Sequence, residues 1–128
     1  MNDGQPVEVL YIEDNHVNAV LVARILERAP GVRLTVCPTG ESGFATACTL
    51  KPALILLDLQ LPDIDGFEIL RRLRHDEGHR GPVFVLTADA SAGSRERAAL
   101  AGADLVLTKP LDVAEFLQAV TLTLRAAA

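Results

Sequence analysis

The sequence has few of the features that mark exported, membrane or disulfide-stabilised proteins. Its two cysteines, Cys37 and Cys48, fit neither a CxxC motif nor a zinc site, so free thiols in a reducing cytoplasm are expected. Although 49% of the residues are hydrophobic, no apolar run is long enough to cross a membrane. The start of the chain, Met1 to Pro6, lacks the basic and apolar segments of a signal peptide. These absences predict a cytoplasmic location without a membrane anchor.

The charge and the length narrow the class of protein further. The net charge of −5 disfavours nucleic acid and anionic membranes as partners. No repeat, linker-like stretch or low-complexity segment divides the 128 residues. This length suits one domain with a real hydrophobic core. The prediction is therefore a single domain over residues 1–128.

One apolar stretch stands out, from Ala53 to Leu57, and it ends abruptly at Asp58. It is too short for a typical helix and too apolar for a strand with one wet face, which favours a strand buried on both faces of a parallel sheet. A loop rich in turn-forming residues follows, from Leu59 to Gly66. An ionisable group just past such a strand lies where open α/β folds bind their ligands.

Strands and helices alternate along the whole chain. Strands are expected at 7–12, 32–37, 53–57, 82–86 and 105–107, and helices at 15–29, 39–50, 67–75, 91–101 and from 113 onward. Strict alternation indicates a parallel sheet covered by helices on both faces. The prediction is an α/β fold, a flavodoxin-like (βα)5 doubly wound sheet with strand order 2-1-3-4-5, whose site lies between the first and third strands.

Hydrophobic periodicity predicts which side chains are covered. The first helix presents Val22, Ile25, Leu26 and Ala29, and the last presents Val113, Phe116, Leu117, Val120 and Leu124. The strand at 32–37 alternates, with Val32, Leu34 and Val36 on one side and a wet face of Arg33, Thr35 and Cys37 on the other. The basic residues Arg71, Arg72, Arg74 and Arg80 are interpreted as a solvated surface with Glu68 and Asp76 as counter-ions.

Reactive side chains gather at the expected carboxyl edge of the sheet. They are Glu13 and Asp14 after the first strand, Asp58 after the third, Thr87 after the fourth and Lys109 after the fifth. Carboxylates held close together repel one another, and a hard cation such as Mg²⁺ relieves that repulsion. A lysine and a hydroxyl opposite them suit the oxygens of a phosphoryl group. The set therefore points to an aspartyl phosphate.

Four stretches, each at a strand end, together resemble the receiver domain of two-component response regulators. They are residues 9–15, 56–66, 85–88 and 102–110, so the resemblance extends over essentially the whole chain. It implies a phosphoprotein that takes a phosphoryl group from a phosphohistidine, on a histidine kinase or a histidine phosphotransfer protein, and signals through altered protein contacts. The resemblance implies a phosphoacceptor signalling domain and not an enzyme, although such a domain catalyses its own phosphorylation and dephosphorylation.

The resemblance assigns the metal and acceptor residues. Asp58 resembles the phosphoacceptor and Asp14 the direct carboxylate ligand of Mg²⁺, for which Mn²⁺ is an alternative. Glu13 resembles a ligand that acts mostly through water, and the backbone carbonyl of Gln60 completes the protein's share of the metal shell.

It also assigns the residues that read the phosphate. Thr87 resembles the switch hydroxyl, Ala88 and Lys109 bind phosphoryl oxygens with it, and the Lys109–Pro110 peptide is expected to be cis. Gln60 and Asp89 occupy the positions that tune the lifetime of the phosphate. Val106 departs from the family, which often has an aromatic residue three positions before the lysine. That puts in doubt the coupling of the phosphate to the face of helix 4, strand 5 and helix 5, where a downstream partner or a transient homodimer is expected.

Other interpretations remain open. Asp14 or Asn15 suits the cap of the first helix, Thr87 suits the cap of the fourth, and Lys109 suits a solvated loop. As a whole, the chain is either a stand-alone regulator without an output domain or a receiver from a larger protein such as a hybrid kinase, which residues 13–18 resemble. A pseudo-receiver that never takes phosphate is the main alternative. A related aspartate-nucleophile phosphatase needs an acid where this chain has Gln60. A flavin-binding domain needs a first loop that holds a phosphate, and Glu13 and Asp14 would repel one.

Overall fold

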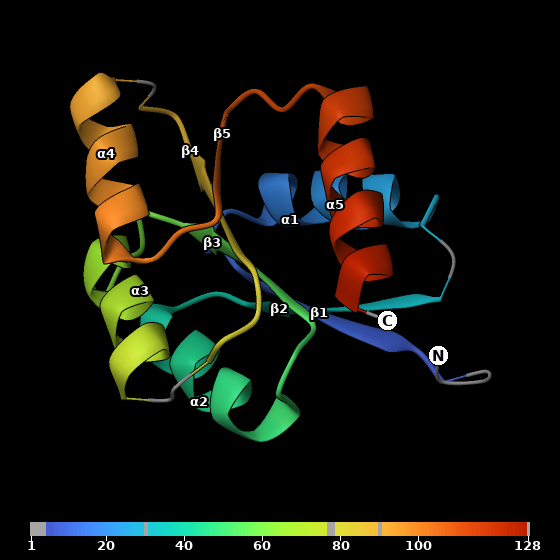
Figure 1. The fold of residues 1–128 in the computed structure, drawn as a ribbon, viewed down its shortest axis with the longest axis horizontal. Helices are drawn as coiled ribbons and strands as arrows, with labels where there is room; N and C mark the ends of the chain where they lie inside the picture. The colour runs from blue at the N-terminus through green and yellow to red at the C-terminus, as the bar shows by residue number, and fades with distance from the viewer. Residues whose placement is uncertain (1–4, 30, 77–78, 90, 128) are drawn as a thin grey trace.

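The structure, a computed structural model, describes residues 5–29, 31–76, 79–89 and 91–127. Five parallel strands form one sheet in the order β2-β1-β3-β4-β5 (Figure 1). The elements are β1 (Val7–Ile12), α1 (His16–Leu26), β2 (Val32–Cys37), α2 (Gly40–Leu50), β3 (Leu54–Asp58), α3 (Gly66–His75), β4 (Val83–Thr87), α4 (Ala92–Ala101), β5 (Leu105–Thr108) and α5 (Val113–Ala127). The predicted fold class and strand order are confirmed.

Two hydrophobic layers enclose the sheet. One packs α2, α3 and α4 against one face, and the other packs α1 and α5 against the opposite face. The central strand β3 contributes to both, because Ile55 and Leu57 belong to the first layer while Leu54 and Leu56 belong to the second. Every residue of β3 is buried, as the uninterrupted apolar run predicts. Asp58 is thereby held at the end of a strand that is buried along its whole length.

The turn from β3 into α3 depends on Gly66. A Cβ atom at this position would lie 2.4 Å from the Cα of Leu59, so only glycine lets α3 begin this close to the loop that follows Asp58. The Gly66 backbone N–H donates to the Leu59 carbonyl at 3.1 Å. Asp63, in the same loop, accepts the Gly40 and Glu41 backbone N–H groups at 2.8 and 2.9 Å. These bonds fix the loop after Asp58 against α2 and α3.

The predicted exposure of four side chains is wrong. Cys37, assigned to a wet face, is buried with α2 and donates to Thr46 Oγ1 at 3.3 Å, whereas Val36, assigned to the covered side, is exposed. Helix α2 covers the carboxyl end of β2, so simple alternation fails there. Val113 is exposed because it begins α5 one turn before Phe116, which reaches the core. Arg74 is not solvated, since its guanidinium bonds backbone carbonyls.

The remaining helix-packing predictions agree with the structure. Val22, Ile25, Leu26 and Ala29 are buried, as are Phe116 and Val120 of α5. No helix within the described ranges combines the length and the apolar character that crossing a membrane requires. The prediction for the start of the chain falls partly outside the described residues, because residues 1–4 are not among them.

Candidate functional site

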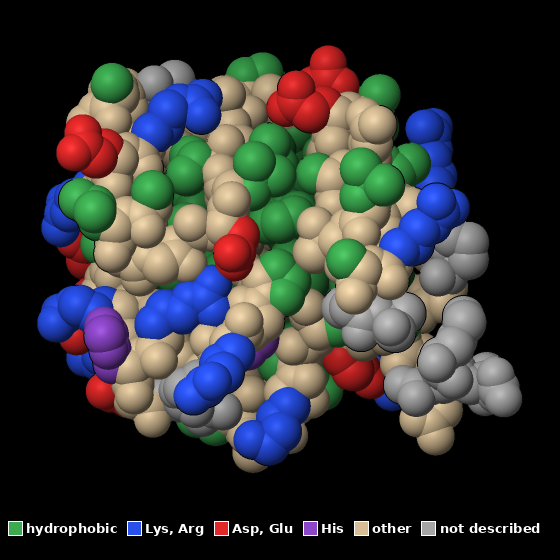
Figure 2. Space-filling view, in the orientation of Figure 1, with side chains coloured by type: hydrophobic (Ala, Val, Ile, Leu, Met, Phe, Trp, Pro, Cys, Tyr) green, Lys and Arg blue, Asp and Glu red, His purple; other side chains and the backbone are tan. Residues whose placement is uncertain are grey.

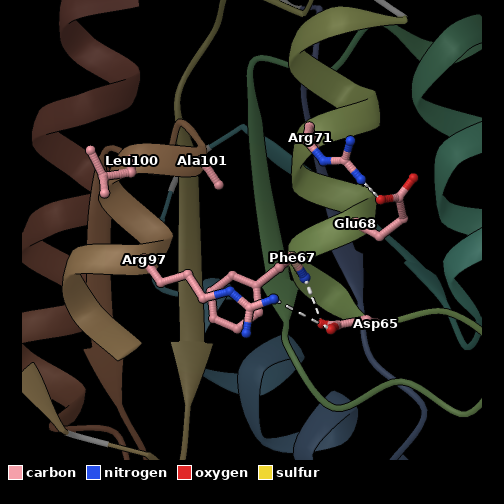
Figure 3. Close-up of a pocket in the computed structure, with 7 residues that line it drawn as sticks. All are labelled: Asp65, Phe67, Glu68, Arg71, Arg97, Leu100 and Ala101. Carbon is pink, nitrogen blue, oxygen red and sulfur yellow. Dashed lines mark hydrogen bonds and ion pairs between the residues drawn. The ribbon is translucent and has the colours of Figure 1, made fainter. Parts of the chain in front are cut away.

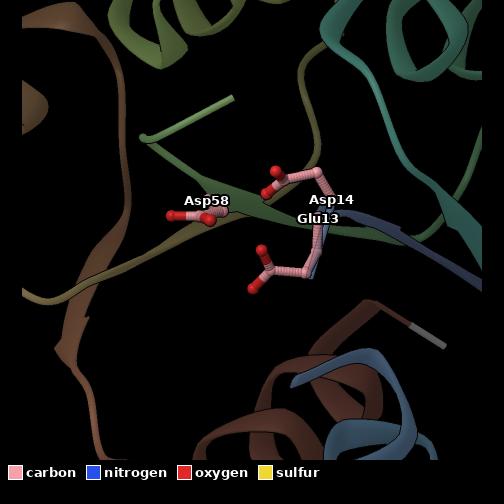
Figure 4. Close-up of side chains that lie close together, drawn as sticks. All are labelled: Glu13, Asp14 and Asp58. Atoms are coloured by element: carbon pink, nitrogen blue, oxygen red, sulfur yellow. The ribbon is translucent and has the colours of Figure 1, made fainter. Parts of the chain in front are cut away.

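The acidic side chains meet at the carboxyl ends of β1 and β3. Glu13 and Asp14 directly follow β1, and Asp58 is the last residue of β3. One carboxylate oxygen of each of these three residues lies within 4.8 Å of one carboxylate oxygen of each of the other two, so the three form a cluster (Figure 4). These neighbouring strands are continued on opposite sides of the sheet, which is the switch point where doubly wound folds place their ligands. The predicted acidic cluster is therefore present.

Burial divides the cluster into an inner and an outer part. Glu13, Asp58 and Thr87 are the buried polar residues among those described, with exposed fractions of 2%, 5% and 2%. Asp14 is exposed and lies at the solvent side. Buried carboxylates need compensating charge or hydrogen bonds, because desolvation penalises their ionised form. The site therefore combines two enclosed acids with one that faces water.

Lys109 supplies positive charge to this cluster. Its Nζ lies 2.8 Å from Glu13 Oε1 and 3.5 Å from Asp58 Oδ2. The Lys109 backbone N–H donates to the Thr87 carbonyl at 2.8 Å, which extends the pairing of β4 and β5 by one residue. The Lys109–Pro110 peptide is cis, as predicted. Lys109 is thus a member of the site and not a solvated loop lysine.

Two neutral residues that sequence reasoning missed also bind Glu13. Its Oε1 accepts the Tyr11 hydroxyl at 2.8 Å and Asn18 Nδ2 at 3.2 Å. Burial and the neighbouring Glu13 raise the pKa of Tyr11 above its usual value, so its hydroxyl remains a donor. The period of a strand offers a clue, because Tyr11 lies two residues before Glu13 and therefore on the same face.

The buried carboxylates have opposite pKa shifts. Burial alone would raise the pKa of Glu13, but hydrogen bonds with Asp58, Lys109 and Tyr11 outweigh it and lower the pKa to about 2. Burial and the hydrogen bond with Glu13 raise the pKa of Asp58 to about 7. Glu13 is therefore the more acidic of the two buried carboxyl groups. A divalent cation near both would favour the ionised form of each, so the donor set fits a hard metal ion.

The other predicted residues lie around this centre. Gln60 donates its backbone N–H to Asp58 Oδ1 at 3.2 Å, and its side chain is exposed. The Thr87 hydroxyl accepts the Asp89 backbone N–H at 3.0 Å, while the Asp89 carboxylate accepts from Ser91 and Ser94 at the start of α4. Ala88 is exposed between Thr87 and Asp89. Asp89 therefore points toward α4 and does not join the acidic cluster.

Val106 is separated from the acidic residues by β4. It lies on β5 in register with Val85 and packs against the hydrophobic layer of α2, α3 and α4. Its carbonyl accepts Arg95 Nη1 at 3.4 Å. The aliphatic side chain of Val106 thus packs in the core at the position where receiver domains often have an aromatic residue.

The capping interpretations are wrong for two of the site residues. Of the two predicted cap residues of α1, Asn15 is the N-cap and Asp14 is not, because the Asn15 side chain accepts the Asn18 backbone N–H at 3.0 Å. Ser91, and not Thr87, is the N-cap of α4, where it accepts the Ser94 N–H at 3.2 Å. Asp14 and Thr87 are therefore available to the site.

A separate pocket of about 330 Å³ lies between α3 and α4 (Figure 3). It is lined by Asp65, Phe67, Glu68, Arg71, Arg97, Leu100 and Ala101. Its charges are largely matched within the pocket, because Arg71 pairs with Glu68, and Arg97 lies over the Phe67 ring and 3.9 Å from Asp65. Nothing in this lining selects a charged ligand.

Comparisons with known proteins agree with this geometry. Residues 9–121 match the family model of the response regulator receiver domain. The probable transcriptional regulatory protein TcrX of Mycobacterium tuberculosis is 39% identical over 97% of this chain, which corresponds to 50% of TcrX. The polar-differentiation response regulator DivK of Brucella anthropi is 33% identical over 90% of this chain and 94% of DivK. The chain thus spans about half the length of TcrX and nearly all of DivK.

A solved structure extends the similarity to three dimensions. The receiver domain of a Pseudomonas aeruginosa sensor histidine kinase is 33% identical, with a TM-score of 0.82, and the match covers 94% of this chain and 98% of that one. It was solved with a magnesium ion coordinated in its active-site cleft. The family model covers most of this chain, and DivK is matched along nearly its full length. The chain therefore belongs to the response regulator receiver domain family.

Proposed function

We propose that this domain accepts a phosphoryl group from a phosphohistidine onto Asp58 and signals through altered protein contacts. Receiver domains are phosphoacceptor signalling domains of two-component systems. The observation that supports the proposal best is the enclosure of Asp58 between an acidic pair and Lys109. A buried carboxylate in this setting is a nucleophile whose charge and position are both controlled.

Glu13, Asp14, Asp58 and the backbone carbonyl of Gln60 would hold a Mg²⁺ or Mn²⁺ ion. The acidic cluster and the raised pKa of Asp58, about 7, support this assignment. The magnesium ion in the related Pseudomonas receiver supports it as well. When bound, the cation offsets negative charge on the carboxylates and on the phosphoryl oxygens during transfer.

The transfer itself is an in-line displacement at phosphorus. A carboxylate oxygen of Asp58 forms the new O–P bond while the P–N bond of the phosphohistidine breaks. The imidazole leaves with the electron pair of that bond and takes up a proton from solvent. Lys109, already 3.5 Å from Asp58, pairs with one phosphoryl oxygen, and the Thr87 hydroxyl and the Ala88 backbone N–H bind the others.

Thr87 connects the phosphate to the signalling surface. Its hydroxyl accepts the Asp89 N–H, and Asp89 binds the first turn of α4 through Ser91 and Ser94. Rotation of the Thr87 side chain toward a phosphoryl group would move the oxygen that accepts the Asp89 N–H, and would shift the population of α4 positions. Figure 2 shows hydrophobic side chains gathered between α4 and α5, over β4 and β5. This face suits a downstream protein partner, and a transient homodimer through it stays a prediction.

Helix α1 offers a surface for the phosphoryl donor. Val17, Val20 and Leu21 are exposed on the helix that begins beside the acidic cluster. An apolar patch rimmed by polar residues is typical of a protein contact. We propose that a histidine kinase or histidine phosphotransfer protein docks there. The match covers nearly all of DivK and about half of TcrX, so this domain would be either almost the whole of a regulator or one part of a longer regulator or kinase.

Intact mass after incubation with acetyl phosphate and Mg²⁺ tests the acceptor. The expected result is the gain of one phosphoryl group by the wild type, with no gain in Asp58→Asn or in the presence of EDTA. Thr49→Ala, an exposed substitution on α2, serves as a control that should gain phosphate normally. If the folded protein takes phosphate neither from acetyl phosphate nor from a phosphohistidine donor, the pseudo-receiver becomes the better interpretation.

A further inference from the structure

The two oxygens of Glu13 have unequal surroundings. Oε1 accepts hydrogen bonds from the Tyr11 hydroxyl, Asn18 Nδ2 and Lys109 Nζ, at 2.8, 3.2 and 2.8 Å. Among the described side-chain contacts, Oε2 accepts the Asn15 backbone N–H at 3.3 Å. One oxygen thus accepts from three side-chain donors, whereas the other accepts one backbone N–H and retains acceptor capacity for a further ligand. The orientation of this carboxylate is fixed before any ligand arrives.

Packing does not account for the hydroxyl of Tyr11. The residue is completely buried in the layer of α1 and α5, on a strand flanked by β2 and β3. A phenylalanine would fill the same space without burying a polar group, and a buried hydroxyl is costly unless it is hydrogen-bonded. The partner of this hydroxyl is Glu13. The phenol therefore serves the acidic site.

Lys109 has two alternative partners. It bonds Glu13 at 2.8 Å, yet in the proposed reaction it pairs with a phosphoryl oxygen on Asp58. When Lys109 turns to the phosphate, Glu13 loses its charged donor. Tyr11 and Asn18 stay in place, because one lies within a central strand and the other in the first turn of α1, where Asn15 binds its backbone N–H.

We propose that Tyr11 and Asn18 are positioning residues that clamp Glu13 Oε1 and leave Oε2 directed at the cation. The clamp holds the carboxylate while Lys109 exchanges Glu13 for the phosphoryl group. This inference rests on the proposed function, since it takes a cation and a phosphoryl group as the ligands of the site. Hydrogen-bond partners that orient metal-binding groups commonly affect metal affinity strongly.

Mn²⁺ binding measured by electron paramagnetic resonance, without any phosphoryl donor, is the test. Tyr11→Phe removes only the hydroxyl, and we expect it to weaken Mn²⁺ binding by roughly tenfold. Asn18→Ala should weaken it in the same direction. Thr49→Ala, which deletes a hydroxyl on α2 away from the site, should bind as tightly as wild type. Circular dichroism verifies that each variant is folded.

A double-mutant cycle with Glu13→Ala separates positioning from a general structural effect. If Tyr11 acts through Glu13, Tyr11→Phe causes no further loss of Mn²⁺ affinity once Glu13 is absent. An equal loss in both backgrounds would contradict the clamp. Unchanged or tighter binding by Tyr11→Phe in the otherwise intact protein would also overturn it, while the proposed cation site would stand.

Tyrosine fluorescence provides an independent readout. Tyr11 is the sole tyrosine and the chain has no tryptophan, so the emission reports on this one phenol. Mg²⁺ should change that emission in the wild type and leave it unchanged in Asp14→Asn. No change in a protein that binds Mn²⁺ would contradict the coupling of Tyr11 to the site. Absence of Mn²⁺ binding by folded wild type would overturn both the clamp and the proposed cation site.

Discussion

The carboxyl edge of the β-sheet, where the parallel strands end, and the amino edge, where they begin, are built in opposite ways. At the carboxyl edge, Glu13, Asp14 and Asp58 crowd around Lys109, and the pKa of Asp58 is raised to about 7. This arrangement is costly without a ligand, because burial and the neighbouring Glu13 disfavour the ionised form of Asp58. Under the proposed function, a cation or a phosphoryl group would complete it. The carboxyl edge therefore has the character of a binding site and contributes little to stability by itself.

At the amino edge, one arginine satisfies several backbone groups. The Arg74 guanidinium donates to the carbonyls of Gly102, His79 and Gly81 at distances of 2.6–3.0 Å. It also pairs at 2.8 Å with Asp104, which accepts the Val83 N–H at 2.9 Å. These contacts join the end of α3 to the segments that enter β4 and β5. The comparison teaches that charge is fully paired where the fold needs stability, and that three carboxylates share one lysine at the proposed binding site.

The largest expected change in stability comes from Arg74→Met. The substitution keeps the aliphatic stem and removes the donors, so the carbonyls they bind lose their partners. We expect a loss of about 2–4 kcal/mol in the free energy of unfolding. Arg72→Met on the same helix is the matched control, because Arg72 is 32% exposed against 18% for Arg74 and bonds only carboxylates among the described contacts. Urea unfolding measures the free energy of unfolding of both variants, and equal losses would contradict the comparison of the two edges.

The pH dependence of the metal-free protein tests the opposite edge. The pKa of Asp58 rises from 3.8 to about 7 on folding, so the folded state binds more protons in that range and stability falls as pH rises through it. Glu13 acts oppositely, because its pKa falls from 4.5 to about 2 and its contribution is lost as pH falls through that range.

Asp58→Asn should abolish the decrease between about pH 4 and pH 7. At neutral pH the variant should be more stable than wild type by an amount on the order of 1–3 kcal/mol. Urea titrations in EDTA across this range provide the measurement. A wild-type stability that is flat or rising there would show that the carboxyl edge carries no such cost.

The sequence predicted the carboxyl edge better than the amino edge. Strand ends are visible as apolar runs that stop at a polar residue, and the strand order then brings Glu13, Asp14, Asp58 and Lys109 to one place. The contacts of Arg74 depend on carbonyls from two distant loops, which no local pattern identifies. Its position in a basic run therefore led to the wrong surface assignment.

Within the site, the position of residues was easier to predict than their partners. That Glu13 lies at the acidic edge follows from its place after β1, but its bonds to Tyr11 and Lys109 depend on side-chain direction. Cys37 shows the same limit, since alternation assigned it to water while the packing of α2 buries it. Side-chain periodicity describes an isolated strand, and tertiary packing decides what covers it.

Mg²⁺ should convert the unfavourable carboxyl edge into a stabilising one. A ligand at ten times its dissociation constant stabilises the folded state by about 1.4 kcal/mol through mass action. Asp14→Asn should remove this gain, because it takes away the solvent-facing carboxylate of the cluster. Asp76→Asn, which neutralises an exposed acid after α3, should retain it. Thermal unfolding with and without Mg²⁺ compares the three proteins, and equal gains in all would contradict a site at Asp14.

The smallest effect is expected for Arg33→Ala on the edge strand β2. Arg33 pairs with Glu8 at 3.2 Å across β1 and β2, a distance close to the 2.8 Å between Arg74 and Asp104. Its side chain is 64% exposed, so water and salt screen the pair, and the free energy of unfolding should change by less than about 0.5 kcal/mol. Urea unfolding at low and high salt checks this value. A loss as large as that of Arg74→Met would contradict the comparison. It would mean that the distance within an ion pair, and not the burial of the carbonyls that an arginine binds, determines its contribution to stability.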